Sequence, residues 1–390
     1  MRISDPELHR LQVLKAIRKM EPVARTDLVK ATRLAGGTIT QLTADLLGRR
    51  VLIEEKVAGS GAGRPRMALR INAAAGHALS VIPLPNGRIS LEIVDLKGDC
   101  VFFRESSVER VDTLEQWAHR VAALIAAAID ESPLSKRQIR RIGIVVHGVV
   151  DNVGGIVRWV AYYPDKDVPV ASIVEKQLRI PVVVDSEANV IARAEHWFGG
   201  YTQLDDFSII VVDQGLNSAH YVDGMLWRGA HGINPEFGHT KVFIGEGRPC
   251  YCGGAGCLVT YSAIFGIVSQ ICECRGLKPP PQRKLISAFR QFAAEAREGD
   301  QQLRDIFGKA ASILGTAIAN MISERDPGRL LVVAFEPDLL SMMSNGLLCA
   351  LKANTLPALA GRAEVEFKLI DANQYRKGSA ALALEHIYRS

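Results

Sequence analysis

The sequence predicts an α/β protein with a small helical module at its N-terminal end. From about residue 73 onward, short apolar runs typical of strands alternate with stretches of helical periodicity. Before residue 73, the pattern is instead three short helices followed by two strands. The length of 390 residues suggests two or three domains, and a composition of 48% hydrophobic and 23% charged residues is typical of globular proteins.

The first 72 residues predict one compact order of elements. Leucine and isoleucine residues at helical spacing predict a first helix over residues 8–17, which Pro22 ends. Thr26 is expected to cap a second helix, and a third helix follows a turn near residues 33–37. Two strands then flank a loop, at residues 51–57 and 67–71. This order is that of a winged helix-turn-helix.

Positive charge is concentrated in the same segment. Residues 1–72 contain 14 Lys and Arg against 7 Asp and Glu, whereas the remaining 318 residues contain 33 against 35. A basic module on a near-neutral body is typical of proteins that bind nucleic acid. The positive charge could instead belong to a solvated basic surface. The three helices could instead form a bundle used only for protein contacts.

The third helix and the wing provide the candidate DNA contacts. In a winged helix-turn-helix the third helix enters the major groove. Its polar face is expected to carry Thr38, Thr40, Gln41 and Thr43. The hydroxyl and amide groups of Thr38, Thr40 and Gln41 can pair with bases and phosphates. Arg64 and Arg66 form a basic wing tip suited to the minor groove. We therefore expect double-stranded operator DNA as a partner.

The body is expected to contain mixed sheets. Strands are predicted at residues 91–95, 142–146, 182–185 and 208–212. Helices are predicted at residues 114–129, 186–197, 303–323 and 378–388.

Three cysteines crowd a glycine-rich segment of the body. Cys250, Cys252 and Cys257 follow His239, which lies eleven residues before the first of them. Three sulfurs and one imidazole complete a tetrahedral zinc shell and leave no open position for catalysis. The spacing predicts structural Zn²⁺, and the alternative is three unliganded cysteines in a flexible loop.

Cysteine usage and hydropathy indicate a cytoplasmic protein without a membrane partner. Seven cysteines, three of them clustered, favour a reducing compartment over a disulfide framework. The longest apolar stretches, such as residues 121–129, fall short of the roughly 20 residues that span a bilayer. Charges at Arg2, Asp5 and Glu7 leave no apolar region for a secretory signal.

Two runs around the predicted metal ligands carry a family resemblance. Gly232-Ile-Asn-Pro-Glu-Phe-Gly-His239 and Cys250-Tyr-Cys-Gly-Gly-Ala-Gly-Cys-Leu258 closely resemble the signature of the ROK family (repressors, open reading frames and sugar kinases). Residues 143–151 and 224–229 are also similar to its usual pattern. The resemblance covers essentially the whole chain. It implies an actin/hexokinase-like (ribonuclease H-like) body of two α/β lobes with a sugar cleft between them.

The resemblance implies three parts. Residues 1–72 form the DNA-binding domain. Residues 73–195 form the first lobe, on which the C-terminal helix 378–390 packs. Residues 196–377 form the second lobe with the zinc-binding loop.

The resemblance also implies which residues contact a ligand. Glu236 and His239 match positions that contact sugar hydroxyls, so His239 would serve both sugar and zinc. Ser186 replaces the usual Asn, and Glu187 occupies the place of the catalytic Asp, where we interpret it as a sugar hydrogen-bond partner. Val259 replaces a Glu that usually holds sugar hydroxyls, which changes specificity. The alternative is a cleft that has lost ligand binding.

Three nucleotide-binding elements of ROK kinases are altered in this chain. The first phosphate loop reads Ile82-Pro-Leu-Pro-Asn-Gly87, and its two prolines remove amide donors. The second reads Asp213-Gln-Gly-Leu-Asn217, with a carboxylate where phosphate would lie. Val333-Ala-Phe335 replaces the two glycines that face adenosine. These changes predict that the protein is not an enzyme and has no catalytic residues.

Together, these features predict a transcriptional regulator, a repressor, that senses a carbohydrate or related metabolite as its small-molecule effector. One alternative is an active ATP-dependent sugar kinase that carries a DNA-binding domain. The other is a constitutive DNA-binding protein with a purely structural body. Symmetric operators favour a homodimer or homotetramer.

Overall fold

The computed structural model describes residues 5–57, 66–84, 87–109 and 111–389. The chain forms two compact units, each discontinuous in sequence. Unit 1 comprises Met1–Asp185, Trp197–Gly199 and Arg376–Ser390. Unit 2 comprises Ser186–His196 and Gly200–Tyr375.

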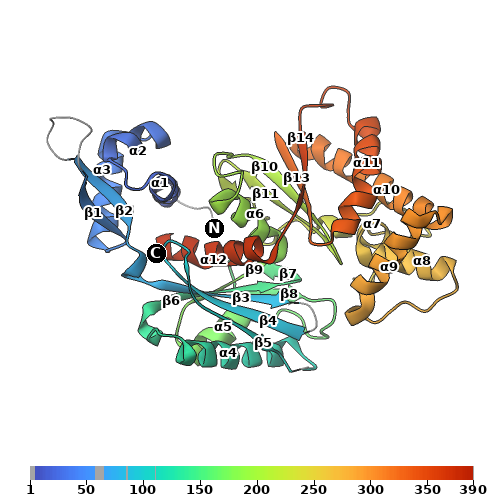
Figure 1. Ribbon diagram of the computed structural model, residues 1–390, viewed down its shortest axis with the longest axis horizontal. Helices are drawn as coiled ribbons and strands as arrows, with labels where there is room; N and C mark the ends of the chain where they lie inside the picture. Colours follow the sequence, from blue (N-terminus) through green and yellow to red (C-terminus); the bar gives the residue numbers. More distant parts are fainter. Residues whose placement is uncertain (1–4, 58–65, 85–86, 110, 390) are drawn as a thin grey trace. The chain divides into compact units, whose positions relative to one another are not determined.

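The first part of unit 1 is a winged helix-turn-helix, as the sequence predicts. Three helices lie beside a two-stranded antiparallel ribbon (Figure 1). These elements are α1 Asp5–Met20, α2 Arg25–Thr32, α3 Gly36–Gly48, β1 Leu52–Val57 and β2 Arg66–Ile71. The wing tip with Arg64 lies outside the described residues.

Two predicted details of this module are wrong. The N-cap of α2 is Ala24, which makes no side-chain cap, so Thr26 lies inside the helix and does not cap it. Thr43 is predicted to lie on the polar face of α3, but it is fully buried. Its hydroxyl accepts a hydrogen bond from Arg25 Nε at 2.8 Å and donates to Thr40 O at 3.2 Å. Position 43 lies one turn from Ile39 and therefore belongs to the apolar side.

The rest of unit 1 is built on a five-stranded sheet of order β5-β4-β3-β6-β9. Its strands are β3 His77–Leu84, β4 Arg88–Asp95, β5 Cys100–Ser107, β6 Ile139–Val146 and β9 Val182–Ser186. The first three pair antiparallel, and β6 lies parallel to β3. One face is covered by α4 Leu114–Glu131 and α5 Val170–Leu178, and the other by α12 Ala372–Arg389 (Figure 1). Smaller elements are η1 Ala73–Ala75, η3 Lys136–Gln138, β7 Val149–Asp151 and β8 Ile156–Trp159.

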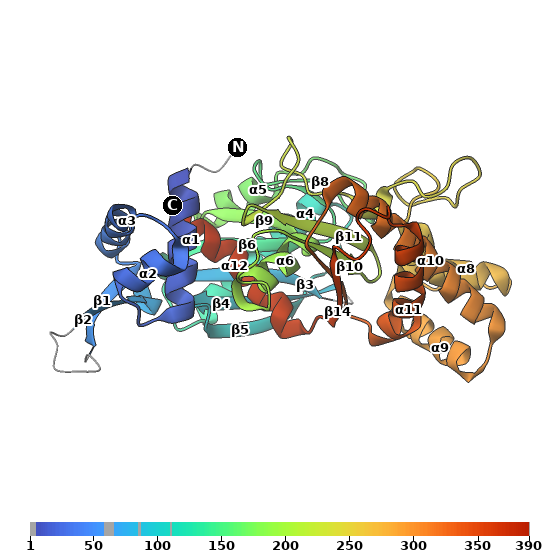
Figure 2. The ribbon, with the colours of Figure 1, turned by 90° about the horizontal axis from the view of Figure 1, so that it is seen from above.

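One apolar cluster joins the winged helix-turn-helix to the sheet and to α12. Leu14 of α1, Val94 of β4 and Leu384 of α12 all belong to it and are at most 1% exposed. A Cβ on Gly143 would lie 3.3 Å from the Ala383 side chain, so α12 packs directly on β6. Figure 2 shows α12 between α1 and the sheet from a second side. The DNA-binding module and the first sheet therefore share a core.

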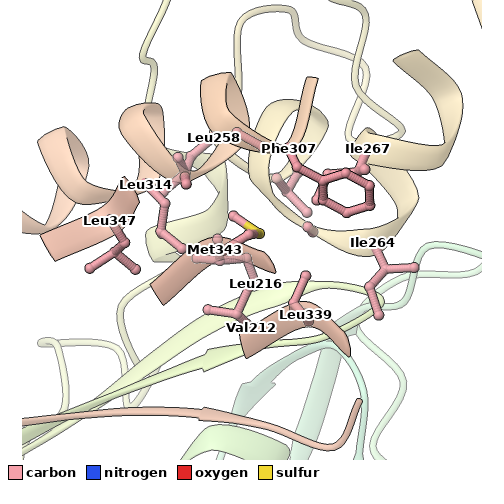
Figure 3. Close-up of a cluster of buried hydrophobic side chains, with 14 of the residues drawn as sticks. Val212, Leu216, Leu258, Ile264, Ile267, Phe307, Leu314, Leu339, Met343 and Leu347 are labelled. Atoms are coloured by element: carbon pink, nitrogen blue, oxygen red, sulfur yellow. The ribbon is translucent and has the colours of Figure 1, made fainter. Parts of the chain in front are cut away.

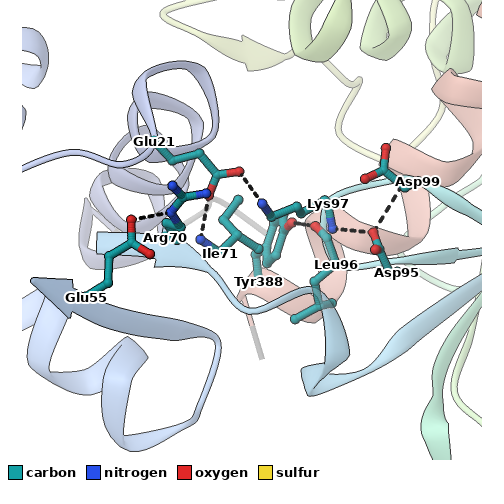
Figure 4. Close-up of polar contacts among 9 residues, drawn as sticks. All are labelled: Glu21, Glu55, Arg70, Ile71, Asp95, Leu96, Lys97, Asp99 and Tyr388. Atoms are coloured by element: carbon teal, nitrogen blue, oxygen red, sulfur yellow. Dashed lines mark hydrogen bonds and ion pairs between the residues drawn. The ribbon is translucent and has the colours of Figure 1, made fainter. Parts of the chain in front are cut away.

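Polar contacts reinforce this junction (Figure 4). Glu21 Oε2 accepts a hydrogen bond from the Ile71 backbone N–H at 2.8 Å, and Glu21 Oε1 pairs with Lys97 Nζ at 2.8 Å. The hydroxyl of Tyr388 donates to Leu96 O. The first contact holds the end of α1 to β2 within the module, and the other two tie Glu21 and α12 to the turn that follows β4.

Unit 2 is built on a second five-stranded sheet, of order β12-β11-β10-β13-β14. Its strands are β10 Phe207–Val212, β11 Leu216–Val222, β12 Met225–Leu226, β13 Arg329–Ala334 and β14 Glu364–Leu369. Strands β10, β13 and β14 run parallel, and β11 and β12 add antiparallel edges. The remaining elements are α6 Glu187–Phe198, η4 Phe237–His239, α7 Val259–Ser262, α8 Ile264–Cys274, η5 Gln282–Lys284, α9 Leu285–Glu298, α10 Gln301–Arg325 and α11 Pro337–Asn354.

Helix α10 is the core helix of unit 2. The side chain of its N-cap, Asp300, accepts a hydrogen bond from the Leu303 N–H, and left-handed Asp326 ends the helix. Within the described residues, α10 is the one helix long and apolar enough to cross a membrane. In Figure 3, however, its Leu314 points toward Met343 of α11, and the ring of its Phe307 lies beside Ile267 of α8. These contacts account for its apolar character as part of a protein core.

Candidate functional site

The four predicted metal ligands converge in unit 2. The donor atoms of His239, Cys250, Cys252 and Cys257 all lie within 4.8 Å of one another. Cys252 Sγ lies 3.8 Å from Cys257 Sγ, and Cys250 Sγ lies 3.7 Å from His239 Nδ1. With Zn–S bonds of about 2.3 Å, a tetrahedral shell places neighbouring sulfurs roughly 3.8 Å apart. The cluster can therefore hold a tetrahedral metal ion.

Glycines give the cysteine loop its shape. Gly256 has a φ of 73°, and a Cβ there would lie 2.2 Å from Phe243 O. The Cys250 N–H donates to Gly254 O at 2.8 Å, which closes a tight turn. A side chain at position 256 would push the two arms of the loop apart and separate the sulfurs.

A lysine lies beside the thiol cluster. Lys241 Nζ donates to Cys257 Sγ at 2.9 Å, and this hydrogen bond raises the pKa of Lys241. Burial opposes ionisation of Cys252, but the Gly254 N–H, the neighbouring thiols and Lys241 outweigh it and lower the pKa of this thiol. Because three thiolates exceed the charge of a divalent ion by one, the ammonium group balances the loaded cluster.

The predicted ligand residues lie at two places in unit 2. Glu236 and His239 flank the start and end of η4, and burial raises the pKa of Glu236 to about 7. Ser186, 4% exposed, is the last residue of β9, and half-buried Glu187 is the first of α6. A helix N-terminus favours a carboxylate such as that of Glu187. Both places offer polar groups that can bind the hydroxyls of a small ligand.

The predicted DNA contacts fall on the start of α3. Thr40 and Gln41 are exposed, and Thr38 is half-buried. The Thr40 hydroxyl donates to Gly36 O at 2.9 Å, so it can only accept a hydrogen bond from a partner, whereas the Gln41 amide can both donate and accept. Arg66 begins β2, but its side chain lies outside the described part of the chain, as Arg64 does.

The segments that correspond to nucleotide loops are bonded within the protein. Carbonyl groups of the turn after β10 accept hydrogen bonds from the first two N–H groups of α8, Ile264 to Asp213 at 2.9 Å and Phe265 to Gln214 at 3.4 Å. Helix N-terminal donors that can bind phosphate are thereby occupied. Phe335 packs against the Tyr375 ring, with centroids 5.4 Å apart.

The first altered loop corresponds to the end of strand β3. Pro83 lies within β3, in register with Ile89 of β4. Pro85 lies outside the described residues.

A winged helix-turn-helix joined to α/β units, one of which carries a cluster of one histidine and three cysteines, defines the class of DNA-binding regulators built on a sugar-kinase-like body. Comparison with known families agrees with this class. The chain belongs to the ROK family, whose sequence profile matches residues 88–380. The predicted family is therefore confirmed.

The similar proteins are repressors by name. The chain is 26% identical over 333 residues to the xylose repressor of Caldicellulosiruptor bescii. The aligned region covers 84% of this chain and 82% of that protein. It is 25% identical over 380 residues to the DNA-binding transcriptional repressor Mlc of Escherichia coli K12. Here the aligned region covers 96% of this chain and 92% of the relative. These relatives agree with the prediction of a transcriptional regulator.

Solved structures confirm the predicted fold. A ROK family transcriptional regulator, a homologue of E. coli Mlc, superposes with a TM-score of 0.80 at 23% identity and covers 98% of this chain and 97% of its own. A ROK glucokinase from Streptomyces griseus gives a TM-score of 0.62 at 23% identity, over 79% of this chain and 98% of its own. Nearly the whole kinase thus matches part of this chain. This is expected for a kinase-like body with an added module.

Proposed function

We propose that this protein is a transcriptional repressor that binds operator DNA through α3 and the wing and releases or retains it according to a sugar effector. The observation that carries the proposal is the exposed amide of Gln41 on α3, presented by a module that shares its core with the ROK body. The concentration of positive charge in residues 1–72 supports DNA as the partner.

Substitution of Gln41 tests the DNA-binding surface. An operator is first selected with the full-length protein from random duplexes, because removal of residues 1–72 would expose the shared core. Gln41→Ala is expected to weaken binding to this operator by about 1–3 kcal/mol, the usual value of a side-chain pair with a base. Binding to random DNA should change little, since that binding depends on phosphate contacts.

The matched control is Gln203→Ala, which changes an exposed glutamine of unit 2 and should leave operator binding unchanged. Fluorescence anisotropy measures both affinities. An equal loss on operator and random DNA, or no loss on the operator, contradicts the assignment of α3 as the reading helix.

A sugar effector is supported by Ser186, Glu187, Glu236 and His239, which offer hydroxyl, carboxylate and imidazole groups. Relatives named for xylose and for N-acetylglucosamine support the same class of ligand. A sugar at 100 times its dissociation constant should stabilise the protein by about 2.7 kcal/mol, which a thermal-shift screen detects. A protein that no sugar stabilises would have a purely structural body.

The remaining assignments follow from the same features. We infer that the cluster of His239 and the three cysteines holds structural Zn²⁺, because four protein ligands of this softness suit zinc and leave no open position. The seven cysteines are all free thiols, which supports a cytoplasmic location. Operator symmetry supports a homodimer or homotetramer. We also infer that the protein is not an enzyme.

A further inference from the structure

Asn234 is a buried polar residue that lies outside the predicted ligand contacts. It is 3% exposed, and within the described part of the chain neither its Nδ2 nor its Oδ1 has a hydrogen-bond partner. Two residues later, Oε1 of Glu236 is likewise buried without a described partner. Folded proteins pair nearly all such atoms, so three unpaired atoms in one short segment call for a partner that binds there.

The neighbouring backbone offers Asn234 few partners. Pro235, between the two side chains, has no N–H group. The Gly229 N–H donates to Ile233 O at 2.8 Å, and the His239 N–H donates to Glu236 O at 2.9 Å. Two carbonyl groups next to this pair of side chains therefore already accept backbone hydrogen bonds.

The segment is also held in place, so Asn234 has little freedom to turn elsewhere. A Cβ on Gly238 would lie 2.2 Å from Leu216 O, which shows how closely the segment packs on β11. Pro235 restricts the backbone of Asn234 to extended conformations. The Asn234 amide is thus fixed near Glu236, which is one of the candidate ligand contacts.

The chemistry of the two side chains indicates what they bind. The amide of Asn234 offers a donor and an acceptor on neighbouring atoms, and the Glu236 carboxyl group offers a further oxygen. A hydroxyl group both donates and accepts, so neighbouring hydroxyls can satisfy all three atoms. A ligand that lacks one of these hydroxyls would leave a buried amide atom unpaired and would be rejected.

We propose that Asn234 is a specificity-determining residue of the effector site, where its amide, together with Oε1 of Glu236, binds neighbouring hydroxyl groups of a sugar. This inference rests on the proposed sensing of a sugar, and it adds the residue that recognises the hydroxyl pattern. If Asn234 binds a ligand, its amide contributes to sugar affinity. If Asn234 is structural, its amide stabilises the ligand-free fold.

The ligand-free protein provides the first test. Asn234→Leu replaces the amide with an apolar side chain of similar volume, and the full-length variant is expected to melt at the same temperature as the wild type or higher, because no protein hydrogen bond is lost. The control is Asn152→Leu, which removes the hydrogen bond from Asn152 Nδ2 to Val184 O at 2.8 Å and should lower the melting temperature. A decrease for Asn234→Leu as large as that of the control overturns the inference.

Binding provides the second test. Calorimetry with D-glucose, D-xylose and N-acetyl-D-glucosamine identifies the sugar that binds the wild type, and Asn234→Leu should weaken that binding roughly tenfold or more. Deoxy analogues of the same sugar then locate the contact. For the analogue that lacks the recognised hydroxyl, wild type and variant should bind equally, because the interaction is absent from both.

The possible failures are distinguishable. If the wild type binds a sugar and Asn234→Leu binds it equally well, the role of Asn234 is wrong and the sensing function stands. If the wild type binds none of the three sugars, the proposed function fails, and this inference fails with it.

Discussion

At the scale of single residues, His220 shows how burial sets the chemistry of one side chain. It lies on β11, is 2% exposed, and its ring nitrogens contact Ser208 Oγ at 2.8 Å and Ser218 Oγ at 3.2 Å. Burial, with a smaller contribution from the charge of Arg325, lowers the pKa of His220 to about 3. The folded protein therefore contains a neutral imidazole at every pH near neutrality.

This burial predicts a loss of stability in mild acid. Between the unfolded pKa near 6.5 and the folded pKa, the unfolded chain binds a proton that the folded chain does not, so stability falls as the pH falls through this range. From pH 7 to pH 5 the loss from this group is about 2 kcal/mol. Urea unfolding of wild type and His220→Gln at both pH values measures it. The variant should lose less stability than the wild type, and equal losses would assign the pH dependence to other groups.

The role of a residue was predictable from sequence where that role depends on the chemistry of its side chain. It was less predictable where the role depends on burial. The convergence of His239 with Cys250, Cys252 and Cys257 was predictable because Cys and His at that spacing have few other uses. The prediction for Thr43 is wrong because its hydroxyl suggests an exposed position, although its spacing of four residues from Ile39 places it on the apolar side, where the hydroxyl accepts a hydrogen bond from Arg25. Asn234 was passed over because an unpaired amide is a property of the folded state alone.

At the scale of elements, the cysteine loop should depend on a bound metal for its stability. Cys252→Ser should lose the metal, about one zinc per chain, and destabilise unit 2, because metal binding contributes directly to folding. Cys274→Ser is the matched control, since Cys274 is an exposed cysteine at the end of α8 and outside the cluster. Metal analysis and thermal unfolding are the measurements. A folded wild type without metal, prepared without chelator, would contradict the assignment.

The elements that sequence predicted include long apolar ones, whereas the strands it did not predict lie both inside the sheets, as β3 and β13 do, and at their edges, as β5 and β14 do. Helix α10 and strand β10 were both placed to within two residues at each end. Strand β5 lies at a sheet edge with no fully buried residue, and its second half, residues 104–107, is polar. Helix α12 begins at Ala372, six residues before its predicted start, because its polar first turns become helical only in the context of the fold.

At the scale of the molecule, the shared core predicts that the DNA-binding module and the first sheet unfold together. Tyr388 is fully buried, stacks with Trp197 and donates to Leu96 O. Tyr388→Phe removes this hydrogen bond and should cost about 1–2 kcal/mol. Hydrogen exchange should show equal loss of protection in α1 and in β4, whereas Tyr162→Phe, at a residue 66% exposed, should change neither. Loss confined to one of the two elements would show that they unfold separately.

The whole chain, finally, has a kinase-like fold, and we predict that its altered loops do not bind a nucleotide. The α8 amides that could bind phosphate are bonded to the Asp213 and Gln214 carbonyls, and Phe335 packs on Tyr375 where the family has glycines. Glu187→Asp restores the family's carboxylate at the position of the catalytic base, but it restores none of the nucleotide contacts, and phosphoryl transfer needs both. Neither wild type nor Glu187→Asp should therefore phosphorylate any sugar. Equilibrium binding of Mg–ATP decides the matter, because micromolar affinity together with turnover on any sugar would make the protein a kinase that carries a DNA-binding domain.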